Sequence, residues 1–160
     1  MSQVVDLMAP AGTEVPSAGI GRKAATLHRL SAAGLPVPKA VALPYDLVAQ
    51  IVAGTPEALR TCRQAATELG FPLVVRSSAS MEDTGSGAAP GLFESVVDVH
   101  DWDQLFKAVC HVHDSGRTPL VEAYRRTRGI TEAPEVAVIL QRHIDSADCD
   151  GLGSGTGVLY

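Results

Sequence analysis

Apolar residues recur with the period of a helix in five parts of the chain. One helix carries Leu27, Leu30 and Ala33 on a single face and ends at Gly34. The other four are predicted over residues 44–52, 56–69, 101–113 and 119–128. Thr55 and Pro56 make the start of the helix over 56–69 especially clear, because threonine suits the N-cap and proline the first helical position.

Short strands are predicted between these helices, over residues 41–43, 73–77, 93–99 and 135–141. The segment 135–141 is almost unbroken Val, Ala, Ile and Leu, which is typical of a central strand buried on both faces. In the segment 93–99, the apolar residues Phe93, Val97 and Val99 mostly alternate with polar neighbours, as in a strand with one apolar face. The elements therefore alternate along the chain, and no internal repeat is present.

Composition limits the classes of function. The 160 residues suggest about one domain, and 46% hydrophobic residues are enough for a real core. Thirteen basic and eighteen acidic side chains give a net charge of −5, which argues against nucleic acid or an anionic membrane as the main partner. No apolar run approaches the roughly 20 residues that span a bilayer, and residues 1–9 do not resemble a secretion signal.

The cysteines and histidines do not form a recognisable metal or disulfide pattern. Cys62, Cys110 and Cys149 are odd in number and widely spaced, which favours a reduced cytoplasmic protein. His111 and His113 lie two apart on a predicted helix, about 200° around its axis, so they cannot share one metal ion. The sequence therefore predicts no metal site among its own residues.

The segment 74–83 has the pattern of a polyphosphate site. An apolar run delivers Arg76, two hydroxyl groups and the carboxylates of Glu82 and Asp83 to its end, and a loop rich in Gly and Ala follows, closing at Gly91. A strand of this kind fixes a cation, and a loop of small residues lets backbone N–H groups approach an anion. The alternative is a strand capped by a surface loop with an ordinary salt bridge.

A second candidate cation is Lys23. It follows Gly19 and Gly21 in the first turn of the helix that contains Leu27. The start of a helix offers free N–H groups and positive potential, so an anion is favoured there, whereas a lysine is not. This position suggests that Lys23 serves a ligand; the alternative is a solvated lysine.

These two segments belong to a series of motifs in the chain. In order, they are Gly21-Arg22-Lys23-Ala24-Ala25-Thr26-Leu27, Ala33-Gly34-Leu35-Pro36-Val37-Pro38, Val75 to Asp83, Tyr124-Arg125, Val136 to Gln141 and Ser154-Gly155-Thr156-Gly157-Val158. The series resembles the N-terminal nucleotide-binding domain of the phosphoenolpyruvate synthase and pyruvate phosphate dikinase family, which also includes the rifampicin phosphotransferases. The resemblance covers nearly the whole chain, and several motifs in one order are more specific than any single glycine pattern.

The resemblance implies an α+β fold that is ATP-grasp-like, with residues 1–160 as the N-terminal subdomain of the nucleotide-binding domain. The chain ends on the apolar residues Val158, Leu159 and Tyr160, which are similar to a strand that has only begun. The second ATP-grasp half and the phosphohistidine domain are expected beyond this point. An uncovered strand of this kind is expected to favour self-association.

The implied function is phosphoryl transfer from ATP, through an enzyme histidine, to pyruvate or another small acceptor. Mg²⁺ would accompany ATP, with its ligands in the second half, and the 160-residue chain is not expected to be active alone. The alternative is a non-catalytic nucleotide-binding or protein-interaction module that keeps the fold.

The resemblance also assigns roles at the phosphates. Lys23 would meet the α- or β-phosphate, and Arg76, the candidate catalytic residue, would meet the β- or γ-phosphate. Gly91 and its neighbours would close over the phosphates with backbone N–H groups, and Ser95 would add a hydroxyl. Cations dominate this set, because positioning and electrostatics do most of the work in phosphoryl transfer.

At the adenine, the resemblance assigns contacts to the segment of Gln141, Arg142 and His143, through its backbone and a side-chain amide. Here the sequence departs from the family, which usually has a hydrophobic residue where this segment is polar. A second departure is Arg22, which replaces a glycine beside the expected phosphate site.

Overall fold

The strands of the protein form one antiparallel sheet. The computed structural model describes residues 3–13, 15, 17–80 and 92–144. Within them the strand order is β1–β2–β5–β3–β4, and every neighbouring pair is antiparallel. The strands are β1 (Val5–Asp6), β2 (Ala40–Leu43), β3 (Leu73–Ala79), β4 (Ser95–Val99) and β5 (Val136–Arg142). β5 lies between β2 and β3, with residues 136–141 buried, so its prediction as the central strand is confirmed.

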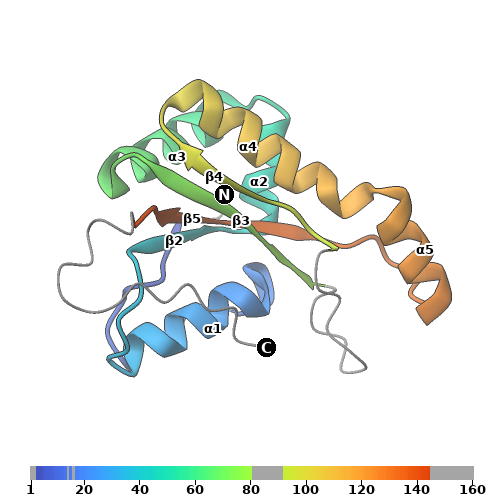
Figure 1. Ribbon diagram of the computed structural model, residues 1–160, viewed down its shortest axis with the longest axis horizontal. Helices are drawn as coiled ribbons and strands as arrows, with labels where there is room; N and C mark the ends of the chain where they lie inside the picture. Colours follow the sequence, from blue (N-terminus) through green and yellow to red (C-terminus); the bar gives the residue numbers. More distant parts are fainter. Residues whose placement is uncertain (1–2, 14, 16, 81–91, 145–160) are drawn as a thin grey trace.

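Helices cover both faces of the sheet (Figure 1). They are α1 (Gly21–Ala32), α2 (Tyr45–Val52), α3 (Pro56–Leu69), α4 (Trp102–Asp114) and α5 (Pro119–Arg128). In Figure 1, α2, α3 and α4 lie above the sheet, α1 lies below it, and α5 stands at the right-hand end. The four helices predicted over residues 44–52, 56–69, 101–113 and 119–128 agree with α2 to α5 to within one residue at each end, and α1 ends two residues before Gly34. The predicted α+β fold is therefore confirmed.

Two separate groups of apolar side chains pack on the two faces. Val136, Val138 and Leu140 of β5 join the larger core under α2, α3 and α4. Ile139 points the other way and joins a smaller core with α1. This alternation is the two-residue period of a strand, and it explains why β5 contains almost no polar residue.

The prediction that Val97 belongs to the apolar face of β4 is wrong. The strand begins at Ser95, and Val97 is 58% exposed, while Val96 packs against the larger core. The reason is a shift of register, because Val96 pairs with Val75 whereas Val99 pairs with Leu73. Asp98 sits in this shift with φ of +55°, so the strand contains a bulge that reverses the face of the residues before it.

Burial also sets the reactivity of the cysteines. Cys62 on α3 is 1% exposed, and this burial raises the pKa of its thiol from 9.0 to about 12. Burial and the nearby Asp114 carboxylate also raise the pKa of the Cys110 thiol, but this side chain is only partly buried. Cys149 lies outside the described residues.

We therefore expect Cys62 to resist alkylation in the folded protein. A thiol with a pKa of about 12 has almost no thiolate at pH 8, and the side chain offers no access to the reagent. Iodoacetamide labelling followed by peptide mass spectrometry should modify Cys110 in the native protein and Cys62 only after unfolding by urea. Equal labelling of the two in the native state would contradict the packing of α3.

Candidate nucleotide-binding site

Helix α1 covers only part of its face of the sheet. Beneath it, Ala40, Ala42 and Ile139 of β2 and β5 are fully buried. On the neighbouring strands β3 and β4, the residues that point to the same face include Arg76, which is partly buried, and Val97, which is exposed. On β3, α1 packs at Ser78, whereas Ser95 and Val97 of β4 are exposed. The part of this face around Arg76, Ser95 and Val97 is called the open surface beside α1.

Arg76 and Ser95 lie directly opposite each other on this open surface. The register pairs them across β3 and β4. Side chains of such a pair share a face, with Cβ atoms about 4.5–5.5 Å apart. Ser95 is exposed and Arg76 partly buried. The structure thus brings together two of the residues predicted from the sequence, a guanidinium and a hydroxyl, both of which donate hydrogen bonds.

Gln141 lies beside Arg76 on the same face. It pairs with Val74 on β3, two residues before Arg76, and with Ala40 on β2. The Arg76 Nη1 donates a hydrogen bond to Gln141 Oε1 at 3.3 Å. Gln141 is only 7% exposed, and Arg76 is partly buried. No local pattern indicates this contact, because the two residues are 65 positions apart.

The start of α1 rests on the same strand as Arg76. Ser78, two residues beyond Arg76 on β3, is fully buried, and its Oγ accepts a hydrogen bond from the Ala24 N–H at 3.1 Å. Gly21 packs so tightly here that an added Cβ would lie 2.6 Å from the Ser78 carbonyl oxygen. Lys23 therefore lies on a helix whose first turn is fixed to β3, and its contact with a phosphate stays a prediction.

Ser78 bears on one expectation from the sequence. Free N–H groups are expected at the start of α1; the N–H of Ala24 is bound by the Ser78 hydroxyl, and the availability of the N–H groups before it stays a prediction. Ser78 is thus a cap supplied from a distant strand, since the N-cap residue Ile20 has no capping side chain. The even spacing of Arg76 and Ser78 along a strand is the signal that could have placed both on one face.

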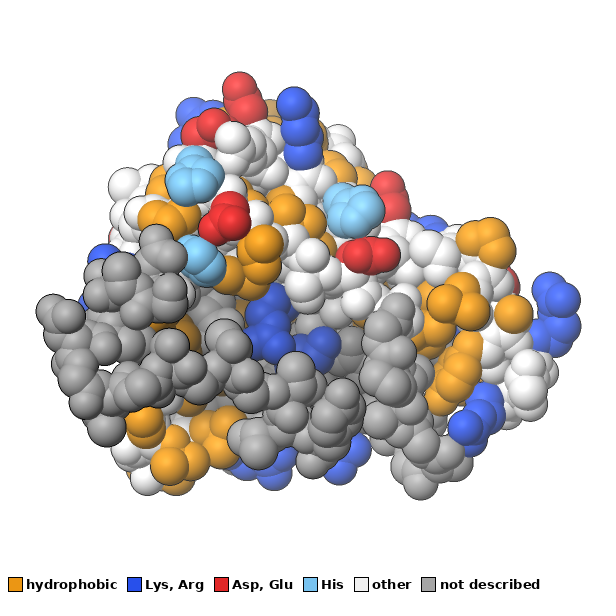
Figure 2. Space-filling view, in the orientation of Figure 1, with side chains coloured by type: hydrophobic (Ala, Val, Ile, Leu, Met, Phe, Trp, Pro, Cys, Tyr) orange, Lys and Arg blue, Asp and Glu red, His pale blue; other side chains and the backbone are white. Residues whose placement is uncertain are grey.

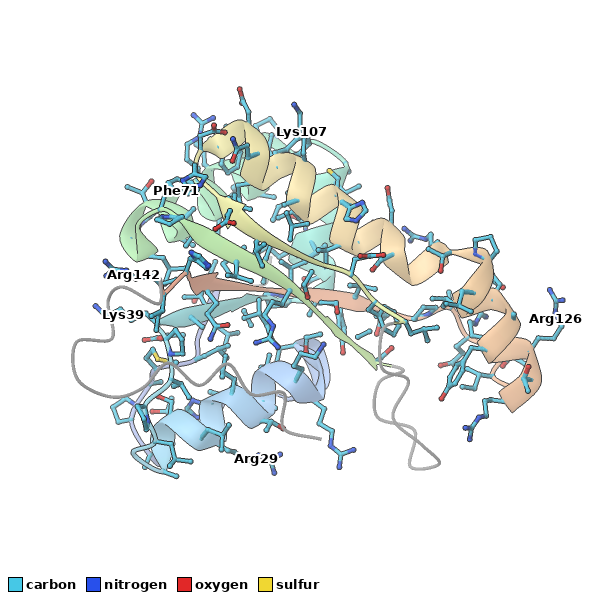
Figure 3. All side chains as sticks on the ribbon, viewed as in Figure 1. Arg29, Lys39, Phe71, Lys107, Arg126 and Arg142 are labelled. Carbon is cyan, nitrogen blue, oxygen red and sulfur yellow. The ribbon has the colours of Figure 1, made fainter. Side chains whose placement is uncertain are left out.

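The residues predicted at the adenine do not all point the same way. Arg142 pairs with Leu73, which belongs to the larger core, so its side chain lies on the face opposite Gln141. Its N–H donates to the Lys39 carbonyl at 2.8 Å, and Figure 3 shows both side chains at the same end of the sheet.

His143 is held beside the bulge of β4. Its Nδ1 lies 3.4 Å from Asp98 Oδ1, and its backbone N–H donates to the carbonyl of Pro72 at 3.0 Å. The side chain of His143 is 26% exposed. Its place beyond the end of β5 puts it near the open surface, and its contact with a base stays a prediction.

Positive charge gathers at the centre of the face that Figure 2 shows. Lys and Arg side chains lie there in the region between α1 and the strands, with hydrophobic, acidic and His side chains above them. The whole chain carries a net charge of −5, so this cluster is a local feature. A local cluster of cations on an open, partly apolar surface is suited to an anionic ligand.

Several predicted residues lie outside the described part of the chain. They are Glu82, Asp83, Gly91, the segment 154–157 and the terminal residues Val158, Leu159 and Tyr160. Their roles, including the self-association expected from the last three, stay predictions.

The fold is that of an α+β domain with a local cluster of cations on one face. The family model of the pyruvate phosphate dikinase AMP/ATP-binding domain matches residues 43–160, and the chain belongs to this family. The family supports ATP or AMP as the nucleotide of this domain; the resemblance predicted ATP. The match includes Arg76, Ser95 and Gln141 but begins after Lys23.

No match was found among curated proteins. Among the described residues, no helix is long and apolar enough to cross a membrane.

Proposed function

We propose that Lys23, Arg76 and Ser95 hold the phosphates of ATP on the open surface beside α1. The observation that supports this best is the pairing of Arg76 on β3 with Ser95 on β4, two residues along β3 from the point where α1 is fixed to Ser78. Residues 1–160 would form the first part of an ATP-grasp-like domain. Gly91 joins the phosphate site in the proposal, and Gln141, Arg142 and His143 belong to it at the adenine end.

The chemistry proposed is phosphoryl transfer from ATP, through an enzyme histidine, to pyruvate or another small acceptor. The residues of this part of such an enzyme would position the phosphates and stabilise their charge, because phosphoryl transfer depends chiefly on these two effects. A guanidinium is suited to that task, since it stays charged and presents several N–H donors in a fixed plane. Arg76 would thus stabilise the charge on the transferring phosphoryl group.

Mg²⁺ would neutralise the phosphates in such a reaction. Among the described residues, no three Asp, Glu, His or Cys side chains come together to hold an ion. The proposal therefore assigns no metal ligand to these residues.

Calorimetric titration tests the proposal. We expect the protein to bind an unreactive ATP analogue and AMP, and to bind the analogue more tightly, because only the analogue carries the β- and γ-phosphates that Arg76 is proposed to meet. Absence of binding to both nucleotides, with the protein shown to be folded, would contradict the assignment. Equal affinity for the two would remove the proposed role of Arg76 at the outer phosphates.

A further inference from the structure

We propose that Gln141 is a positioning residue, whose side-chain amide orients the Arg76 guanidinium toward a phosphate and which acts through Arg76 instead of on the base. This inference rests on the proposed function, which it deepens by dividing the roles within one site. It revises the adenine role that the sequence suggested for the Gln141 side chain.

The geometry of the pair supports such a role. Gln141 is 7% exposed and its strand is central, so the carboxamide has little freedom to move. Its Oε1 accepts from one terminal nitrogen of the guanidinium, at 3.3 Å. A guanidinium has five N–H donors, so this contact leaves the others for a ligand.

A fixed guanidinium binds more tightly than a free one. An arginine side chain loses rotamer entropy when it is held in one orientation. The Gln141 contact already restrains Arg76 before any ligand arrives, so less of this loss falls on binding. This is preorganisation of a phosphate-binding group by a neighbour that need not touch the phosphate.

The neutral charge of Gln141 fits the same role. A glutamate at this position would also accept from Arg76, but its negative charge would offset the guanidinium charge and repel a phosphate. A glutamine supplies the acceptor without that charge. The position therefore calls for an acceptor that is buried, neutral and long enough to reach Nη1 of Arg76.

The discriminating ligand is inorganic tripolyphosphate, which carries the phosphates of ATP without the base. We expect Gln141→Met to weaken binding of tripolyphosphate and of the unreactive ATP analogue by the same factor, about 10-fold, which corresponds to about 1.4 kcal/mol. Methionine keeps the length of the side chain without the acceptor. Gln64→Met is the matched control, because Gln64 is exposed on α3 and bonds only to Glu68 in the described contacts; its affinities should equal those of the wild type.

A loss of affinity for the ATP analogue alone would show that Gln141 contacts the base, and the inference would be wrong. If the wild type binds neither ligand, the proposed function itself fails. If the wild type binds both and Gln141→Met leaves both affinities unchanged, only the present inference fails. Thermal unfolding of each variant shows whether the fold is kept.

Two further variants keep the test decisive if Gln141→Met does not fold. Gln141→Glu retains the size and the acceptor but adds a negative charge. We expect it to weaken the binding of tripolyphosphate, which has no base, by at least the same 10-fold. Gln141→Leu removes the acceptor without adding a charge, and in the Arg76→Ala background its effect on tripolyphosphate binding should be mostly lost, because its partner is gone. An equal effect in the presence and absence of Arg76 would mean that Gln141 acts independently of it.

Discussion

Replacing Arg76 with alanine is expected to weaken binding of an unreactive ATP analogue by about 10- to 150-fold. The estimate follows from one charge-assisted hydrogen bond to a phosphate oxygen, worth roughly 1.5–3 kcal/mol. Arg76 is placed for such a bond, since it lies opposite Ser95 on the open surface and is held by Gln141. Isothermal titration calorimetry of the wild type and the variant measures the change.

Lys23→Ala should produce a loss of similar size, because Lys23 is proposed to meet a different phosphate from an element fixed beside Arg76. Arg126→Ala is a suitable control, since Arg126 is exposed on α5 and points away from the sheet in Figure 3. Wild-type affinity in both Arg76→Ala and Lys23→Ala, with the fold intact, would make these residues ordinary surface cations.

The sequence predicted the elements well because their signals are local. Proline at the start of α3 and α5 marks the helix starts correctly. The run of Val, Ala, Ile and Leu in β5 identifies the central strand, because only a strand covered on both faces tolerates so few polar residues. Each of these patterns is readable within about ten residues of chain.

The details of the site depend on contacts between distant residues, and no local pattern encodes them. The bond of Arg76 to Gln141 follows from the register of β3 on β5. The cap that Ser78 provides for Ala24 follows from the docking of α1, 54 positions away. The bulge at Asp98 could not be predicted from the sequence either, because one extra residue changes the face of a strand without changing its composition.

The largest expected effect on stability is that of Gly21→Ala. Gly21 has φ of +74°, and an added Cβ would lie 2.6 Å from both the carbonyl oxygen and the Oγ of Ser78. The left-handed backbone is unfavourable for alanine by about 1–2 kcal/mol, and the steric clash adds about 1–3 kcal/mol. We expect the free energy of unfolding to fall by about 2–5 kcal/mol in urea denaturation.

Gly34→Ala is the matched control, because it separates the contact from the backbone term. Gly34 has φ of +78°, nearly the same as Gly21, but nothing lies within 4 Å of the position its Cβ would take. Its loss of stability should therefore be about 1–2 kcal/mol, the backbone cost alone. Equal losses in the two variants would mean that the start of α1 does not press on Ser78 in solution. A larger loss for Gly21→Ala, together with weaker binding of the ATP analogue in the folded fraction, would show that the same contact that stabilises α1 also holds Lys23 beside Arg76.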